Sequence, residues 1–189
     1  MDWKESSLSG KLYPALLTSS PPSRSLSARD VSYWSERQRE KLYEYSEEEL
    51  RPYFALPKVL EGMFSLANRL FGIRIVKHSG HDVEVWHPDV QFFDVFDEET
   101  NEHIASFYLD PYSRPAEKRG GAWMDTCIGK SKVMHRIPVA YLVCNGSPPV
   151  GDKPSLMSFG EVETLFHEFG HGLQHMLTRV EHADAAGSK

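Results

Sequence analysis

Residues 158–177 read SFGEVETLFHEFGHGLQHML and form the most strongly patterned segment of the chain. Ser158 and Glu161 fit the N-cap and N3 positions of a capping box, in which each side chain accepts a hydrogen bond from the other residue's backbone N–H. Apolar residues then recur at three- and four-residue spacing, which is typical of a helix packed on a core: Val162, Leu165, Phe166, Phe169, Leu173, Met176 and Leu177. The sequence therefore predicts a long, largely buried helix from about Phe159 to Thr178.

An H-E-x-x-H motif, His167-Glu168-Phe169-Gly170-His171, lies inside this helix. Residues i and i+4 share one helix face, so His167 and His171 can direct their imidazoles at one tetrahedral metal ion. Glu168 lies beside them and can act as the general base that activates a water molecule. Roughly 0.04 random occurrences are expected in a chain of this composition, which favours a metal site over the alternative of two core histidines. Gly170 costs about 1 kcal/mol relative to Ala in a helix, which indicates close packing at that position.

A catalytic zinc ion needs a third protein ligand. The metzincin pattern is excluded, because it requires Gly and His where this chain has Gln174 and Leu177. His175 lies about 12 Å beyond His167 along the helix axis, so we expect it on the surface or beside the site. The remaining candidates follow the helix: Glu181, His182 and Asp184. They can reach the ion only if the chain turns back sharply.

Two further helices are predicted before the motif. Residues 31–45 are highly charged and predict a surface helix with Asp30 as its N-cap. A second helix is expected to open at Pro57 and to end at Gly72. Its apolar residues have helical spacing and are expected in the core: Leu60, Met63, Phe64, Ala67, Leu70 and Phe71.

After residue 72, the spacing of apolar residues changes from that of a helix to that of β-strands. The expected strands are 73–76, 83–86, 90–96, 104–109 and 137–144, with a hairpin across the acidic turn 97–101. Residues 110–132 contain Pro111, Pro115 and the pair Gly120-Gly121, which predict an irregular segment. The histidines near turns are expected as solvated loop residues: His78, His81 and His87. The predicted fold class is α+β, with a small, mostly antiparallel sheet packed against helices that include the motif helix.

Composition excludes several classes of protein. The 189 residues are 40% hydrophobic and carry a formal net charge of −6 without a dense basic stretch, so no nucleic-acid partner is expected. The longest apolar run, near residues 139–144, is far shorter than the roughly 20 residues that span a bilayer, so no membrane association is expected. Cys127 and Cys144 form no CxxC motif and are too few for a disulfide framework, which indicates a reduced, intracellular chain.

Residues 1–28 are rich in Ser and Pro and predict a flexible leader. We therefore expect a cytoplasmic protein. A chloroplast or mitochondrial transit peptide is the alternative, although Asp2 and Glu5 count against it because such peptides contain few acidic residues.

Three runs carry a resemblance to a known family: EELRPYFALPKVLEGMFSLANRLFGI at 48–73, FYLDPYSRPAEKRGGAW at 107–123 and FGEVETLFHEFGHGLQHML at 159–177. Together they resemble the thimet oligopeptidase family of zinc metallopeptidases, closest to its oligopeptidase A branch. The resemblance implies a zincin-like endopeptidase that cleaves short peptides in a deep channel. It also implies zinc held by His167 and His171, with Glu168 as the catalytic base.

The chain also departs from that family. Its members are several times longer, and their third zinc ligand is a Glu in a helix that follows the H-E-x-x-H helix. Residues 29–189 are therefore expected to form a partial zinc metallopeptidase catalytic domain. Two functions remain open: a zinc-dependent oligopeptidase, or a catalytically silent truncated fragment that lacks the third ligand. Apolar faces of the 57–72 and 159–178 helices would then be uncovered, so self-association is also expected.

Overall fold

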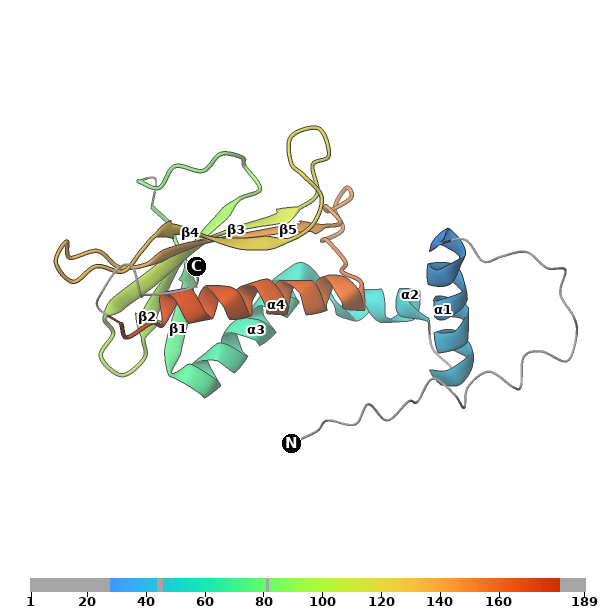
Figure 1. Ribbon diagram of the computed structural model, residues 1–189, viewed down its shortest axis with the longest axis horizontal. Coiled ribbons are helices and arrows are strands. Elements are labelled where there is room, and N and C mark those ends of the chain that lie inside the picture. The colour runs from blue at the N-terminus through green and yellow to red at the C-terminus, as the bar shows by residue number, and fades with distance from the viewer. Residues whose placement is uncertain (1–27, 44–45, 81, 181–189) are drawn as a thin grey trace, which may run out of the picture. The chain divides into compact units, whose positions relative to one another are not determined.

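The computed structural model describes residues 28–43, 46–80 and 82–180, which fall into two units divided after Tyr45 (Figure 1). The first unit contains α1 (Ala28–Tyr43), a charged helix that exposes Trp34 and Leu42. Asp30, expected as the N-cap, instead lies within the first turn, where an acidic residue complements the helix dipole. Apart from Ala28, the predicted leader lies outside the described residues.

The second unit begins with α2 (Glu47–Leu50) and a short 3-10 helix (Arg51–Tyr53), followed by α3 (Leu56–Phe71). Gly72 ends α3 in the left-handed conformation, with φ 63°, and its N–H donates to the carbonyl of Asn68. The residues of α3 that face the core are Leu56, Val59, Leu60, Met63 and Ala67. Leu70 and Phe71 were expected in the core, but they are 65% and 53% exposed because the last turn of α3 extends beyond the packed face.

Five strands form one sheet: β1 (Ile73–Lys77), β2 (Gln91–Asp97), β3 (His103–Tyr112), β4 (Trp123–Ile128) and β5 (Val139–Gly146). Their order is β1-β2-β3-β5-β4, and every pairing is antiparallel except that of β3 with β5. The hairpin of β2 and β3 across the acidic turn is confirmed. The described unit is thus α+β with a mostly antiparallel sheet, as expected.

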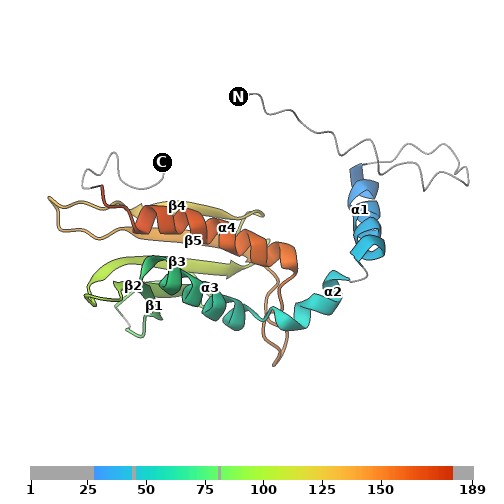
Figure 2. The same cartoon turned by 90° about the horizontal axis from the view of Figure 1, so that it is seen from below.

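The helices α3 and α4 (Phe159–Met176) lie side by side on one face of this sheet (Figures 1 and 2). Aromatic rings fill the space between the layers. Phe107 stacks on Phe93 at 5.0 Å, and Phe64 and Phe169 reach the same cluster from α3 and α4. The core therefore connects both helices with the central strands. Among the described residues, no helix combines the length and the apolar character needed to cross a bilayer.

Two strand predictions are wrong. Residues 83–86 form a loop, because Trp86 packs its ring on Tyr108 and Tyr141 instead of extending the sheet. The strand β4 lies inside the segment expected to be irregular, where its antiparallel pairing with β5, the next strand of the sequence, outweighs the preceding glycines. Both cysteines are free, Cys127 in β4 and Cys144 in β5.

Gly170 and Gly172 make the packing of α4 testable. A Cβ added at Gly170 would enter open space, whereas one at Gly172 would lie 3.0 Å from the Cδ2 of the core residue Leu142. Gly170→Ala should therefore raise the free energy of unfolding by about 1 kcal/mol through helix propensity. The free energy of unfolding of Gly172→Ala should be lower than that of Gly170→Ala by at least about 1 kcal/mol, because the added methyl group overpacks the core. Equilibrium denaturation in the presence of a chelator measures both, and equal stabilities would contradict this packing.

Candidate active site

The capping box of α4 is confirmed and also fixes the helix to the sheet. Ser158 Oγ accepts a hydrogen bond from the Glu161 N–H at 3.2 Å, and the Glu161 carboxylate accepts one from the Ser158 N–H at 2.6 Å. The same carboxylate accepts bonds from the backbone N–H and the hydroxyl of Ser147, which directly follows β5. The start of the motif helix is thereby tied to the end of the strand beneath it.

The two motif histidines converge one turn apart on α4. Their Nε2 atoms lie 3.2 Å apart, and both residues are exposed. The alternative of two core histidines is therefore excluded. Two ligands of a tetrahedral zinc ion at 2.0–2.1 Å are separated by about 3.3 Å, so the spacing of the two imidazoles fits one shared ion.

Glu168 lies beside the histidines and is only 8% exposed. Within the described part of the chain, its carboxylate takes part in no hydrogen bond or ion pair. It borders a cavity of about 380 Å³ together with His171 and residues 122–126; we call this cavity the α4–β4 cleft. A second cavity, of about 760 Å³, joins Glu168 with His167. A buried carboxylate that faces open space on both sides can accept a proton from a water molecule held there.

The wall of the cleft opposite α4 is formed by β4, which is an edge strand paired with β5 alone. His175 holds this strand in place, because its Nε2 lies 3.0 Å from the carbonyl oxygen of Ile128 at the end of β4. His175 is 1% exposed, so the expectation of a surface residue is wrong. The signal for its burial was the stripe it shares with Leu165, Gly172 and Met176 on one face of α4.

Other expectations for this region are corrected. Gly170 is exposed with open space around it, and Gly172 is the tightly packed glycine of the helix. His78 is not a freely solvated loop residue, since its ring nitrogens lie 3.0 Å from Asp82 and 2.6 Å from Asp94. These two carboxylates, Asp82 more than Asp94, raise the pKa of His78.

The remaining candidates for ligands lie elsewhere. His87 lies in the loop before β2, where its Nδ1 accepts the N–H of Asp89. His81 and the proposed third-ligand candidates fall outside the described residues: Glu181, His182 and Asp184. Across 28–43, 46–80 and 82–180, no three His, Cys, Asp or Glu side chains are grouped closely enough to hold a metal ion.

Two imidazoles and a carboxylate on one helix, facing the free edge of a strand, are features of metal-dependent peptidases. The chain belongs to peptidase family M3, whose model matches residues 11–189. This match and the oligopeptidase A relatives described next confirm the resemblance to the thimet oligopeptidase family, in its oligopeptidase A branch.

Three relatives show the extent of the similarity. An Arabidopsis thaliana protein named organellar oligopeptidase A, chloroplastic/mitochondrial, is 58% identical over 87% of this chain and 21% of its own length. A probable cytosolic oligopeptidase A of the same plant is 56% identical over 86% of this chain and 24% of its own. Oligopeptidase A of Escherichia coli K12 is 52% identical over 84% and 23%. The chain thus spans about a fifth to a quarter of the length of these relatives.

Metal binding tests the ligand assignment. His167→Ala and His171→Ala should each abolish whatever stoichiometric zinc the wild-type chain retains after dialysis, because each removes one of two converging imidazoles. His135→Ala is the matched control, since His135 is exposed in a loop far along the sequence from the motif. His175→Ala should lower stability through its lost bond to Ile128 but leave zinc stoichiometry unchanged. Zinc loss in the His135 variant equal to that in the motif variants would show that the ligands are assigned wrongly.

Proposed function

We propose that this chain carries the zinc-binding core of a zincin-like metalloendopeptidase that hydrolyses short peptides. The observation that carries the proposal is the convergence of the His167 and His171 imidazoles beside the Glu168 carboxylate, at the wall of the α4–β4 cleft. Membership of peptidase family M3 and the name oligopeptidase A, borne by several relatives, support it.

The chain's own residues then have distinct roles. His167 and His171 hold the zinc ion, which when bound supplies Lewis-acid polarisation of the scissile carbonyl. Glu168 accepts a proton from the attacking water and donates it to the leaving amine. Its burial against the cleft favours this role, because a carboxylate with few protein partners is free to exchange protons with a water molecule.

The free edge of β4 is proposed to bind the peptide backbone. An extended peptide can add a strand to an exposed sheet edge through main-chain hydrogen bonds. The sheet has two edge strands, β1 and β4, and β4 lines the cleft that also contains Glu168 and His171. A peptide paired with β4 would therefore pass the carboxylate and the imidazoles, which supports β4 as the binding strand.

A catalytically silent chain is the second candidate. It is favoured by the lack of any group of three ligating side chains among the described residues. Two imidazoles alone leave additional open coordination positions, so zinc would be held weakly and exchanged readily. Under this proposal, Glu181, His182 and Asp184 would supply no third ligand.

Compartment and self-association are also proposals. We place the protein in the cytoplasm, with the chloroplast or mitochondrion as alternatives, and the names of the two plant relatives are compatible with either. Short peptides are the proposed partners, without nucleic acid or membrane. The exposed apolar side chains on α3 and α4 support self-association of the chain: Leu66, Leu70, Phe71, Phe159 and Phe166.

Turnover of a quenched fluorescent peptide by the full chain with added zinc tests the catalytic proposal. Glu168→Gln should reduce turnover by at least about 10²-fold, because the amide cannot accept the proton, while the bound zinc is retained. Glu61→Gln is the matched control, since Glu61 is an exposed residue of α3 that lines neither cavity next to Glu168, and it should remain near wild type.

Chelator-sensitive turnover that survives in the Glu168 variant would contradict the assigned base. Absent turnover together with zinc that is lost on dialysis would instead support the silent chain. Loss of both zinc and turnover in Glu181→Ala, His182→Ala or Asp184→Ala would identify the third ligand and exclude the silent chain.

A further inference from the structure

A separate cavity, of about 510 Å³, lies on the face of the sheet opposite α4. This volume falls in the range of small-ligand sites. The register places Trp123 opposite Val143 and Asp125 opposite Tyr141, and all four side chains line the cavity. The intervening pairs face α4, as the packing of Leu142 against Gly172 shows. The strand β4 is therefore a wall of both this cavity, which we call the far-face pocket, and the α4–β4 cleft, and Trp123 and Asp125 border both.

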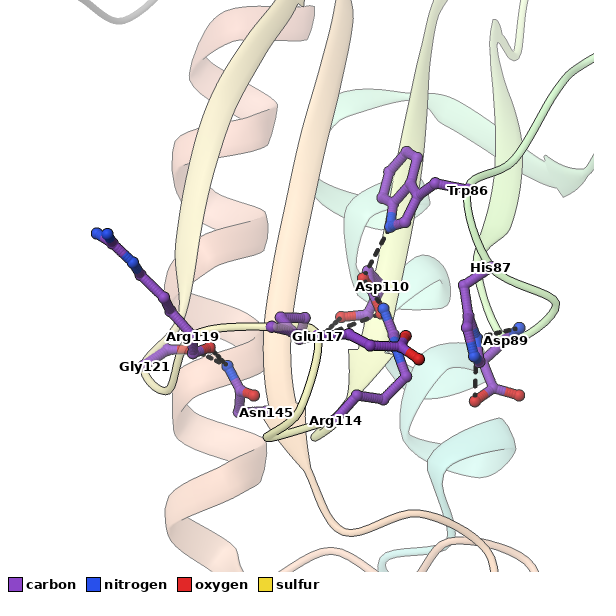
Figure 3. A network of polar contacts seen from close by, with 10 residues as sticks. Trp86, His87, Asp89, Asp110, Arg114, Glu117, Arg119, Gly121 and Asn145 are labelled. Carbon is purple, nitrogen blue, oxygen red and sulfur yellow. Dashed lines mark hydrogen bonds and ion pairs between the residues drawn. The ribbon is translucent and has the colours of Figure 1, made fainter.

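A buried ion cluster forms the base of the far-face pocket (Figure 3). Asp110, 1% exposed, accepts two hydrogen bonds from the Arg114 guanidinium, at 2.8 and 2.6 Å. The Oδ2 atom of Asp110 also accepts a hydrogen bond from Trp86 Nε1 at 3.1 Å. Lys118 Nζ lies 3.0 Å from the Oδ1 atom of Asp110. Burial alone would raise the pKa of Asp110, but these donors outweigh it and lower the pKa. Both cations of the pocket are thus engaged by its own carboxylate.

The net charge of this base is zero. Glu117 Oε2 lies 3.6 Å from Arg114 Nε, so two carboxylates balance the guanidinium and the ammonium. The base therefore has no excess positive charge with which to attract an anion.

The connection between β3 and β4, which contributes Arg114, Glu117 and Lys118 to the pocket, is held by side chain to backbone hydrogen bonds (Figure 3). Asn145 Nδ2 donates to the carbonyls of Arg119 and Gly121, and Lys118 Nζ donates to the carbonyl of Asp110 at 3.2 Å. These bonds fix the connection between β3 and β4.

The surface that a ligand can reach is aromatic and acidic. Trp86 and Trp123 are 51% and 37% exposed. The carboxylate of Asp125 is also exposed and has no cationic partner among the described residues. A hydrogen bond with Cys127 and, to a smaller extent, burial raise the pKa of Tyr141 to about 12, so its phenol stays neutral. Indole faces and carboxylates both attract a cation that has an extended apolar stem.

We propose that the far-face pocket binds an arginine or lysine side chain of a peptide that lies along the free edge of β4. This inference rests on the proposed function, because it takes the same peptide and the same strand. Alternate side chains of an added strand point to opposite faces of the sheet. One set turns toward Glu168 and His171, and the other set lies about 5 Å from Trp123 and Asp125. The pocket then selects among peptides by one peptide side chain. That side chain belongs to a residue adjacent in the peptide to those whose side chains face the α4–β4 cleft.

Tryptophan signals of the full chain offer a direct test. A terminally blocked alanine peptide that contains one arginine is titrated into ¹⁵N-labelled protein in a buffer with a chelator. An analogue with neutral citrulline in place of the arginine is titrated in parallel. We expect the indole N–H signals of Trp86 and Trp123 to shift, with Trp34 in α1 unchanged as an internal control. The arginine peptide should bind at least about fivefold more tightly, within the range of a cation over an aromatic face. Equal affinities, a tighter phenylalanine analogue or no shift of either indole would each overturn the proposal.

Variants separate the pocket from the fold and from catalysis. Trp123→Leu should weaken arginine-peptide binding about tenfold and Asp125→Asn about threefold, whereas Trp34→Leu should change nothing. Each variant should keep the wild-type dispersion of its backbone amide spectrum; wild-type affinity in a folded Trp123→Leu protein would overturn the proposal. Cleavage of both peptides with added zinc is measured separately. Cleavage without preference for arginine would refute only the pocket, whereas arginine-selective binding without cleavage would refute only the proposed function.

Discussion

The attachment of α4 to β4 and β5 is the contact on which the rest of the site depends. Glu161 joins the start of the helix to Ser147 after β5, and His175 joins its last turn to Ile128 at the end of β4. Between these two points, Gly172 allows the helix backbone to approach Leu142 closely. A helix fixed at both ends cannot rotate, so His167 and His171 stay exposed while Glu168 stays against the cleft. These hydrogen bonds between the helix and the sheet thus determine which side of the helix is available for chemistry.

Local features of the sequence predicted much of this arrangement. The capping box of Ser158 and Glu161 needs only residues three apart, and the i, i+4 spacing of the histidines needs only helical geometry. Both were confirmed because no distant contact competes with them. Gly72 as the end of α3 is a similar case, since a left-handed residue is encoded by the single glycine.

Predictions that depend on distant partners were less successful. The strand β4 was hidden by Gly120 and Gly121, because its stability comes from pairing with β5, which follows in the sequence. Gly170 and Gly172 are about 200° apart around the helix, and only the position of the sheet decides which of them is packed. The cluster of Asp110, Arg114 and Lys118 has the spacing i, i+4, i+8, which reads as a polar loop until Asp110 is seen to be buried at the end of β3.

The position of β4 at the edge of the sheet links the α4–β4 cleft and the far-face pocket physically. An interior strand has its backbone groups paired on both sides, so a ligand can approach it only through side chains. An edge strand leaves one row of N–H and C=O groups unpaired, and natural proteins usually cover or distort such an edge because it invites association. Here the edge borders Glu168 and His171 on one face and Trp123, Asp125 and the far-face pocket on the other. A peptide that satisfies the unpaired backbone groups must therefore present its side chains to both cavities at once, so backbone binding and side-chain selection are inseparable at this strand.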